Sequence, residues 1–127
     1  MKLRIKGNSI RLRVSRSELD RFQNRERVEE TIHFAPENDA KLTYALESAR
    51  QTTPVSVRYE HQSVIVTLSE DQSLAWGKPD EIGIYTSVNI GEAGQLEVIV
   101  EKDFACLDRS DEDNADTFTN PHAGSVC

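Results

Sequence analysis

Apolar and polar residues alternate with a period of two in eight short stretches of this chain. This period is typical of β-strands, because successive side chains of a strand point to opposite faces. Between the first two stretches, Gly7-Asn8 predicts a two-residue hairpin turn. The apolar positions of the eight predicted strands are Leu3 and Ile5; Ile10, Leu12 and Val14; Val28, Ile32 and Phe34; Leu42, Tyr44 and Leu46; Val55, Val57 and Tyr59; Val64, Val66 and Leu68; Ile82, Ile84 and Val88; and Leu96, Val98 and Val100.

The alternation breaks after Ser15 and after Ser69, where the pattern predicts two short helices. Both serines open an S-x-x-E/Q motif, with Glu18 or Gln72 at its last position. In such a capping box the serine hydroxyl accepts a hydrogen bond from the first helical turn, and the Glu or Gln bonds back to the serine N–H. Gly77 fits a left-handed residue that ends the second helix.

The same order of elements recurs at an offset of 54 residues. Ile10, Phe22 and Leu42 align with Val64, Trp76 and Leu96, and the two capping serines also coincide. A repeat of this kind predicts one β-β-α-β-β unit that occurs twice. Phe22 and Trp76 take the same helix position, so we expect Trp76 to lie in the core rather than in a ligand site.

These elements predict an α+β fold that is mainly antiparallel β, a closed or half-open eight-stranded barrel with two helices. The alternative is two separate β-β-α-β-β sheets packed face to face. We expect a single domain at residues 1–105, with repeats at about 1–54 and 55–105. The periodicity stops near residue 106, and residues 106–127 are polar and acidic, which predicts a tail that is partly disordered or docked by Phe118.

The composition narrows the class of protein. A chain of 127 residues is long enough for one domain with a real core. No stretch reaches the roughly 20 apolar residues of a membrane helix, and the N-terminus opens directly into a strand pattern rather than an apolar signal region. We therefore expect a cytoplasmic protein without a membrane partner. The two cysteines do not make a disulfide framework.

The net charge of −7 is unevenly distributed. Residues 1–34 contain nine Lys or Arg against five Asp or Glu, whereas residues 101–127 contain two against seven. General nucleic-acid binding needs many phosphate-neutralising cations, so an acidic protein argues against it. A locally basic N-terminal hairpin remains as a feature to explain.

Strand alternation places five cations on one face of this hairpin. Such a cluster predicts an anion site for phosphate or carboxylate, since Arg binds these groups with a two-pronged fork. The alternative is a solvated outer face neutralised by Glu29, Glu47, Glu97 and Glu101. In a closed barrel the charged set would instead line a tunnel. The five cations are Lys2, Arg4, Lys6, Arg11 and Arg13.

The tail contains residue types that bind metals, namely Cys106, His122 and Cys127. Thiolate and imidazole ligands suit zinc, but the spacing fits no established zinc motif, and a reduced buried thiol beside a solvated tail is the alternative. The sequence specifies no cofactor. It also contains no nucleophile elbow, phosphate-binding loop or H-E-x-x-H helix.

The two ends of the chain resemble a family of short bacterial proteins of uncharacterised function. Residues 1–13 read MKLRIKGNSIRLR, residues 101–109 read EKDFACLDR, and Asn120-Pro121 follows in the acidic tail. The resemblance spans nearly the whole chain. It implies a bacterial cytosolic protein, but it does not indicate a catalysed reaction.

The order of elements is also similar to that of CYTH-like triphosphate tunnel enzymes, whose first strand holds a metal through an E-x-E-x-K motif. Here residues 2–6 read KLRIK, with cations where that motif has carboxylates. We therefore expect a non-catalytic binding or adaptor module whose basic hairpin meets an anionic small molecule or an acidic protein segment. The alternative is a metal-dependent phosphate-ester or triphosphate hydrolase. Its substitute metal ligands would be Glu97, Glu101, Glu29 and Glu47.

Overall fold

A computed structural model describes residues 1–105 and 115–119 of the chain. In these residues it contains eight strands, two α-helices and one short 3-10 helix, so the predicted elements are confirmed in number and order. Gly7, with φ +56°, and Asn8 form the predicted hairpin turn between paired Lys6 and Ser9. The elements are β1 (Lys2–Ile5), β2 (Ser9–Val14), α1 (Arg16–Gln23), β3 (Val28–His33), β4 (Lys41–Ala49), β5 (Val55–Glu60), β6 (Ser63–Ser69), α2 (Glu70–Trp76), β7 (Gly83–Asn89), the 3-10 helix (Gly91–Ala93) and β8 (Gln95–Lys102).

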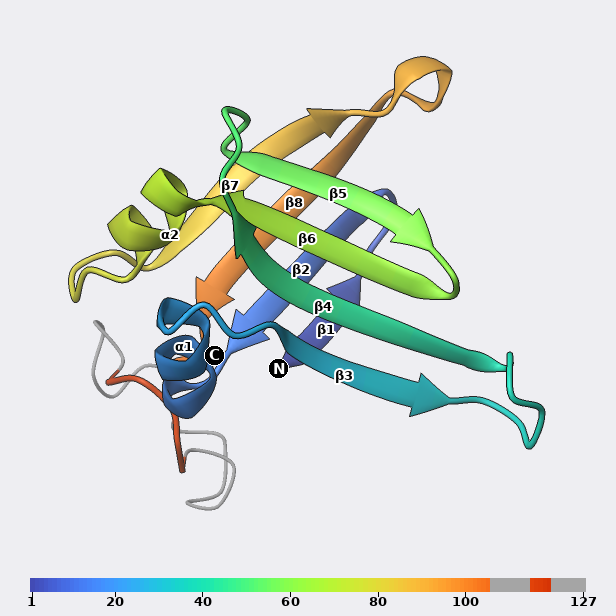
Figure 1. Ribbon diagram of the computed structural model, residues 1–127, viewed down its shortest axis with the longest axis horizontal. Coiled ribbons are helices and arrows are strands. Elements are labelled where there is room, and N and C mark those ends of the chain that lie inside the picture. Colours follow the sequence, from blue (N-terminus) through green and yellow to red (C-terminus); the bar gives the residue numbers. More distant parts are fainter. Residues whose placement is uncertain (106–114, 120–127) are drawn as a thin grey trace.

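The strands form two four-stranded sheets rather than a barrel. Sheet I has the order β1-β2-β8-β7, and sheet II has the order β3-β4-β6-β5. In Figure 1 the strands of the two sheets cross one another, and both helices lie at the same end of the molecule. No ladder joins an edge strand of one sheet to the other sheet in the described residues, so the predicted barrel is not found.

The sheets are mixed, although most strand pairings are antiparallel, as expected. The hairpin partners are antiparallel, but β2 pairs with β8 and β4 pairs with β6 in parallel. Each helix connects a strand of one sheet to a strand of the other: α1 connects β2 to β3, and α2 connects β6 to β7. The alternative prediction of two sheets packed face to face is therefore correct in that two sheets stack. It is wrong in assigning each sheet to one β-β-α-β-β unit, because each sheet combines strands of both halves.

Most strand registers agree with the offset of 54 residues. Lys2 lies opposite Arg13, and Ser56 lies opposite Thr67. The two parallel pairs also correspond, with Ile10 beside Val98 and Tyr44 beside Val64. The remaining hairpins differ: Val28 faces Leu46, but Val100 faces Ile84 rather than Ile82. A two-residue shift thus separates the halves here, and the duplication itself stays a prediction.

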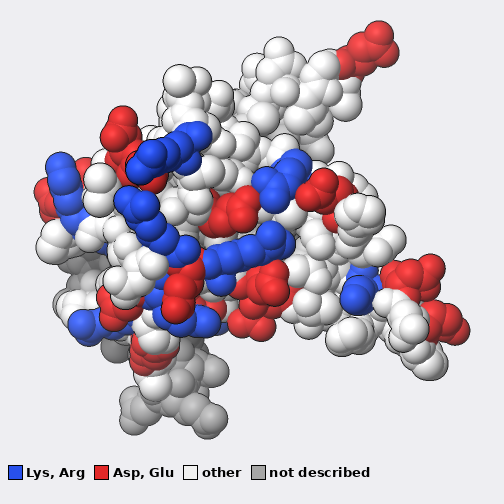
Figure 2. Space-filling view, in the orientation of Figure 1, with Lys and Arg blue, Asp and Glu red and all other residues white. Residues whose placement is uncertain are grey.

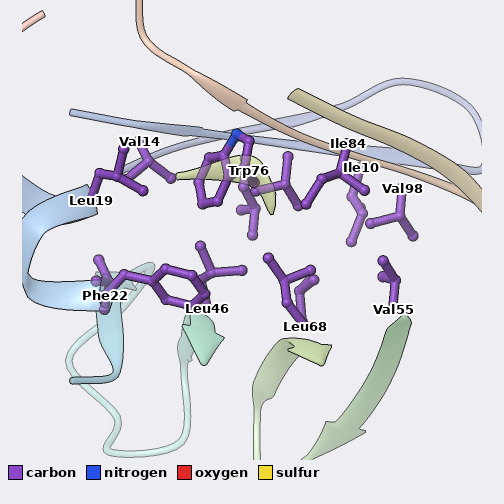
Figure 3. Packing of buried hydrophobic residues seen from close by; sticks show 14 residues of the cluster. Ile10, Val14, Leu19, Phe22, Leu46, Val55, Leu68, Trp76, Ile84 and Val98 are labelled. Atoms are coloured by element: carbon purple, nitrogen blue, oxygen red, sulfur yellow. The ribbon is translucent and has the colours of Figure 1, made fainter. Parts of the chain in front are cut away.

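The core lies between the two sheets and is closed at one end by the helices. At that end the rings of Phe22 and Trp76, both about 1% exposed, meet edge to face with centroids 5.8 Å apart (Figure 3). Trp76 is therefore a core residue, as expected from its alignment with Phe22. Around them lie the buried aliphatic residues Ile10, Leu12, Val14, Leu19, Val28, Leu46, Val55, Val66, Leu68, Ile84, Val98 and Val100.

Both predicted helix starts are present, but only the first has a complete capping box. Ser15 accepts from the Glu18 N–H, and Glu18 accepts from the Ser15 N–H at 3.0 Å. Ser69 accepts from the Gln72 N–H at 3.1 Å, while its own N–H donates to the Pro54 carbonyl. That backbone partner replaces the side chain of the predicted box.

Gly77 follows α2 as predicted, but its conformation is right-handed, with φ −67°. Backbone handedness therefore does not require a glycine here. A Cβ at this position would lie 2.8 Å from the side-chain nitrogen of Gln23, at the end of α1. The two helices are therefore in contact through a residue without a side chain.

The described part of the tail lies beside α1 (Figure 1). Phe118 exchanges backbone hydrogen bonds with Asp103 and Ala105, and its ring contacts Phe104 edge to face. Residues 115–119 are thus attached to the end of sheet I. The predicted division into a domain and a tail stays a prediction.

Candidate functional site

The five predicted anion-binding residues lie together on the outer face of sheet I. Strand pairing places Lys2 opposite Arg13 and Arg4 opposite Arg11, and Lys6 follows at the hairpin turn. The alternating apolar residues of β2, namely Ile10, Leu12 and Val14, face the core. The charged positions therefore point outward, not into a tunnel. We refer to these five cations as the basic face.

Glu101 on β8 neutralises part of the basic face. Its Oε1 atom lies 2.9 Å from Arg13 Nε and 3.4 Å from Arg11 Nε. Its Oε2 atom accepts a hydrogen bond of 3.0 Å from the Tyr85 hydroxyl. Burial and this hydrogen bond raise the pKa of Tyr85 above its usual value. One carboxylate thus holds two arginines and a tyrosine in a fixed arrangement.

Within the part of the chain that the structure describes, the basic face retains cations without an acidic partner. Lys2 Nζ lies 2.9 Å from the carboxylate of the buried Asp103. Arg4 and Lys6 are exposed, and neither has a carboxylate within 4.0 Å among residues 1–105 and 115–119. The face is therefore partly neutralised, but of the four glutamates that the solvated alternative names only Glu101 pairs with it. Two of its cations have no ionic partner among the described residues.

The structure does not bring together the four glutamates considered as metal ligands. Glu97 and Glu101 lie on the outer face of sheet I, whereas Glu29 and Glu47 lie on the outer face of sheet II. Glu97 accepts a hydrogen bond of 2.7 Å from Ser87. In the described residues no three His, Cys, Asp or Glu side chains are grouped as a metal site.

The outer face of sheet II has its own ion pairs. Glu47 accepts from Thr67 at 3.2 Å and lies 3.0 Å from Arg58 and 3.7 Å from Arg27. Lys and Arg side chains alternate with Asp and Glu side chains across the face in Figure 2. Because opposite charges are interleaved, this face offers less uncompensated charge than the basic face.

A polar cavity of about 360 Å³ lies where the basic face meets the start of α1. The α-amino group of Met1 is buried there and forms ion pairs with Glu18 and, at 3.6 Å, with Glu30. Burial alone would raise the pKa of Glu18, but the hydrogen bonds from Met1 and Ser15 outweigh it and hold this pKa below its usual value. The lining residues are Met1, Lys2, Arg13, Ser15, Ser17, Glu18, Arg21, Asp103, Ala115 and Asp116.

Asp116 of the tail also lines this cavity and caps α1. Its carbonyl accepts from the Arg16 N–H at 3.1 Å, and its carboxylate accepts from the Ser17 N–H at 3.0 Å and from the Ser17 hydroxyl. The bonds from Ser17 to the carboxylate lower the pKa of Asp116 below its usual value. The described acidic residue of the tail thus binds the helix rather than the basic face.

Lys102 is a residue that the sequence interpretation missed. It follows Val98 and Val100 in the alternation of β8, which places it on the core side of sheet I, and it is 3% exposed. Its Nζ atom donates to the Lys78 carbonyl at 2.7 Å and lies 5.6 Å from the centre of the Phe118 ring. The sequence feature that could have identified Lys102 is a lysine at a strand position where the alternation predicts an apolar residue.

A model of a family of unknown function (DUF7009) matches residues 1–122 of the chain. The chain belongs to this family. The match agrees with the expected resemblance to an uncharacterised family. No curated protein matches the chain, and no solved structure matches it.

Two further expectations concern the tail and the membrane. Cys106, His122 and Cys127, the hypothetical zinc ligands of the tail, lie outside the described residues. Within the described residues, no helix is both long enough and apolar enough to cross a bilayer.

Proposed function

We propose that this protein is a non-catalytic cytoplasmic binding module whose basic face holds an acidic segment of a protein partner. The observation that carries the proposal is the pairing of Lys2 with Arg13 and of Arg4 with Arg11 across two strands. Like charges opposite each other destabilise a sheet unless they are neutralised. Glu101 and Asp103 neutralise part of the cluster, and a partner's carboxylates would neutralise the rest.

An extended acidic segment fits this face better than a small anion. The cations lie in a row along β1 and β2, spaced as alternate residues of a strand, about 6.6 Å apart. Alternate side chains of an extended partner have the same spacing. The exposed positions of Lys2, Arg4 and Lys6 leave the row open to a long ligand.

The edge position of β1 adds a second reason. Among the described strands β1 is the outermost of sheet I, so its outer edge could pair with another strand. An added strand would place its acidic residues beside Arg4 on one face and its apolar residues beside Ile5 on the other. Ile5 is 62% exposed and would be covered. The proposed ligand therefore alternates acidic and apolar residues.

The hydrolase alternative has less support. A tunnel enzyme needs carboxylates that converge on one metal, and the four candidate glutamates are divided between the outer faces of two sheets. Glu101 and Glu47 are also engaged by arginines. Magnesium- or manganese-dependent triphosphate hydrolysis by the purified wild-type protein would nevertheless favour this alternative over the binding module.

The proposal is tested by titrating the protein with a short peptide of alternating glutamate and valine. We expect binding that weakens as salt rises, because the charges are exposed and screened over about 8 Å at physiological ionic strength. Replacement of Arg4 and Lys6 by Ala should weaken binding by about tenfold or more. The matched control replaces Lys41 and Arg50, which are exposed cations outside the basic face.

The control decides between a site and a general effect of charge. If both double variants weaken the peptide equally, net charge alone explains the binding and the site is wrong. If neither weakens it, the basic face is not the binding surface. A peptide of alternating lysine and valine should not bind, and its binding at the same affinity would contradict the role of charge.

A further inference from the structure

A second cavity, of about 480 Å³, lies beside residues 118 and 119 of the docked tail segment. It is formed where α1, the segment after α2, the end of β8 and the tail meet. Its volume is within the range of small-molecule sites, about 300–1,000 Å³. The lining residues are Arg16, Leu19, Asp20, Gly77, Pro79, Lys102, Phe104, Phe118 and Thr119.

Lys102 is the buried polar group of this cavity. An ammonium group has three N–H donors, and here one donates to the Lys78 carbonyl while the Phe118 ring lies 5.6 Å away. No carboxylate lies within 4.0 Å of Lys102 among the residues that the structure describes. Burying a charge costs free energy, so an anion in direct contact with Lys102 would be stabilised.

The charged residues that line the cavity are two cations and one carboxylate. The guanidinium of Arg16 lies 6.0 Å from the centre of the Phe118 ring, so two cations flank one aromatic wall. Asp20 is the acidic residue of the lining. Burial lowers the pKa of Lys102, while Asp80 and Glu81 act in the opposite direction.

The remaining walls are apolar. The rings of Phe104 and Phe118 meet edge to face with centroids 6.1 Å apart, and Leu19 and Pro79 also line the cavity. Rings in this arrangement accept a further flat apolar group by stacking or edge contact. The cavity therefore combines a buried cation with an apolar surface.

We propose that this cavity binds a small organic monocarboxylate, with the carboxylate on Lys102 and a flat apolar body against Phe104 and Phe118. The proposal is independent of the basic face, which lies on the outer side of sheet I. Because Phe118 and Thr119 belong to the tail, the ligand would also hold residues 115–119 against the domain.

Phenylacetate is the probe, and phenethyl alcohol is its uncharged control. We expect the wild-type protein to bind phenylacetate in a saturable manner by calorimetry, and the alcohol at least about tenfold more weakly. Lys102→Met keeps the length of the side chain and removes its charge. It should reduce phenylacetate affinity about tenfold or more and leave the affinity for the alcohol unchanged.

Lys78→Met is the matched control, because the exposed Lys78 contributes only its backbone carbonyl. It should bind phenylacetate like the wild type. If Lys102→Met does not fold, Arg16→Gln, at an exposed position, should still weaken phenylacetate but not the alcohol. Equal affinity of Lys102→Met and wild type, or of phenylacetate and the alcohol, would overturn the site. Absence of saturable binding by the wild type at millimolar phenylacetate would also overturn it.

Discussion

The N-terminus of α1 is bonded by two separated parts of the chain, its own first turn and the tail, whereas α2 depends mainly on the serine that precedes it. At α1, Ser15 and Glu18 form a capping box, and Asp116 accepts from the next two N–H groups, those of Arg16 and Ser17. At α2, Ser69 caps the Gln72 N–H. The two helices begin with the same motif but are held by different means.

This difference shows what the tail adds to the fold. The first four N–H groups of a helix have no partner within the helix and need one elsewhere. In α1 the partners include a residue almost 100 positions away, at the far end of the chain. The tail segment is therefore part of the support of α1, and the predictions below test how much this support contributes.

The largest expected effect comes from the aromatic pair that both helices share. Phe22→Ala and Trp76→Ala should each destabilise the protein by about 3–5 kcal/mol, because each leaves a cavity in the core. Chemical unfolding of both variants gives the comparison. A loss below about 1 kcal/mol for either would contradict the packing of that helix against the core.

Acid should destabilise α1 through Glu18 and Asp116. Both carboxyl groups have a lowered pKa in the folded protein, so their contribution to stability is present above the unfolded pKa values, near 4, and is lost as the pH falls through the folded ones. The double variant Glu18→Gln, Asp116→Asn should lose about 2 kcal/mol at neutral pH. Its unfolding free energy should then change less than that of the wild type below about pH 4.5.

Asp20→Asn serves as the control, since this carboxylate on α1 makes none of the capping contacts. Unfolding curves are measured at several pH values for all three proteins. If the double variant and the wild type lose stability in parallel on acidification, the capping carboxylates do not carry the acid sensitivity.

Loss of the capping serine should reduce the stability of the protein more at α2 than at α1. Ser69→Ala should cost about 1 kcal/mol, because Ser69 provides the side-chain cap of α2. Ser15→Ala should cost about 0.5 kcal/mol, because Asp116 still accepts from the neighbouring N–H groups of α1. Thermal unfolding distinguishes them. The reverse order would show that the tail contributes little to the start of α1.

Trp76→Phe should have the smallest effect. The indole Nε1 of Trp76 is buried and has no hydrogen-bond acceptor in the described residues. Replacing Trp76 by Phe removes this unsatisfied donor, which offsets part of the lost packing, so we expect a change below about 1 kcal/mol. A larger loss, measured by the same unfolding titration, would indicate that the donor has a partner.

Part of the candidate site, the basic face, could be predicted from the sequence. Period-two alternation placed Arg11 and Arg13 on one face, because alternation is a property of the strand itself. It did not show that Glu101 would neutralise both of them, since that depends on the pairing of β2 with β8. For the same reason Glu29 and Glu97 could not be assigned to opposite faces of the molecule.

The sequence by itself determined the strands, the helix starts and the turn at Gly7-Asn8, because alternation, capping and turn formation involve residues a few positions apart. Only the tertiary structure decided that β2 and β8 run in parallel, that the strands form two sheets instead of a barrel, and that Asp116 caps α1. These features depend on contacts between distant parts of the chain, and local patterns do not specify which partner a strand edge or a helix end will find. Lys102 lies between the two cases: its place on the core side of β8 follows from alternation, but the cavity beside it exists only because α1, β8 and the tail meet there.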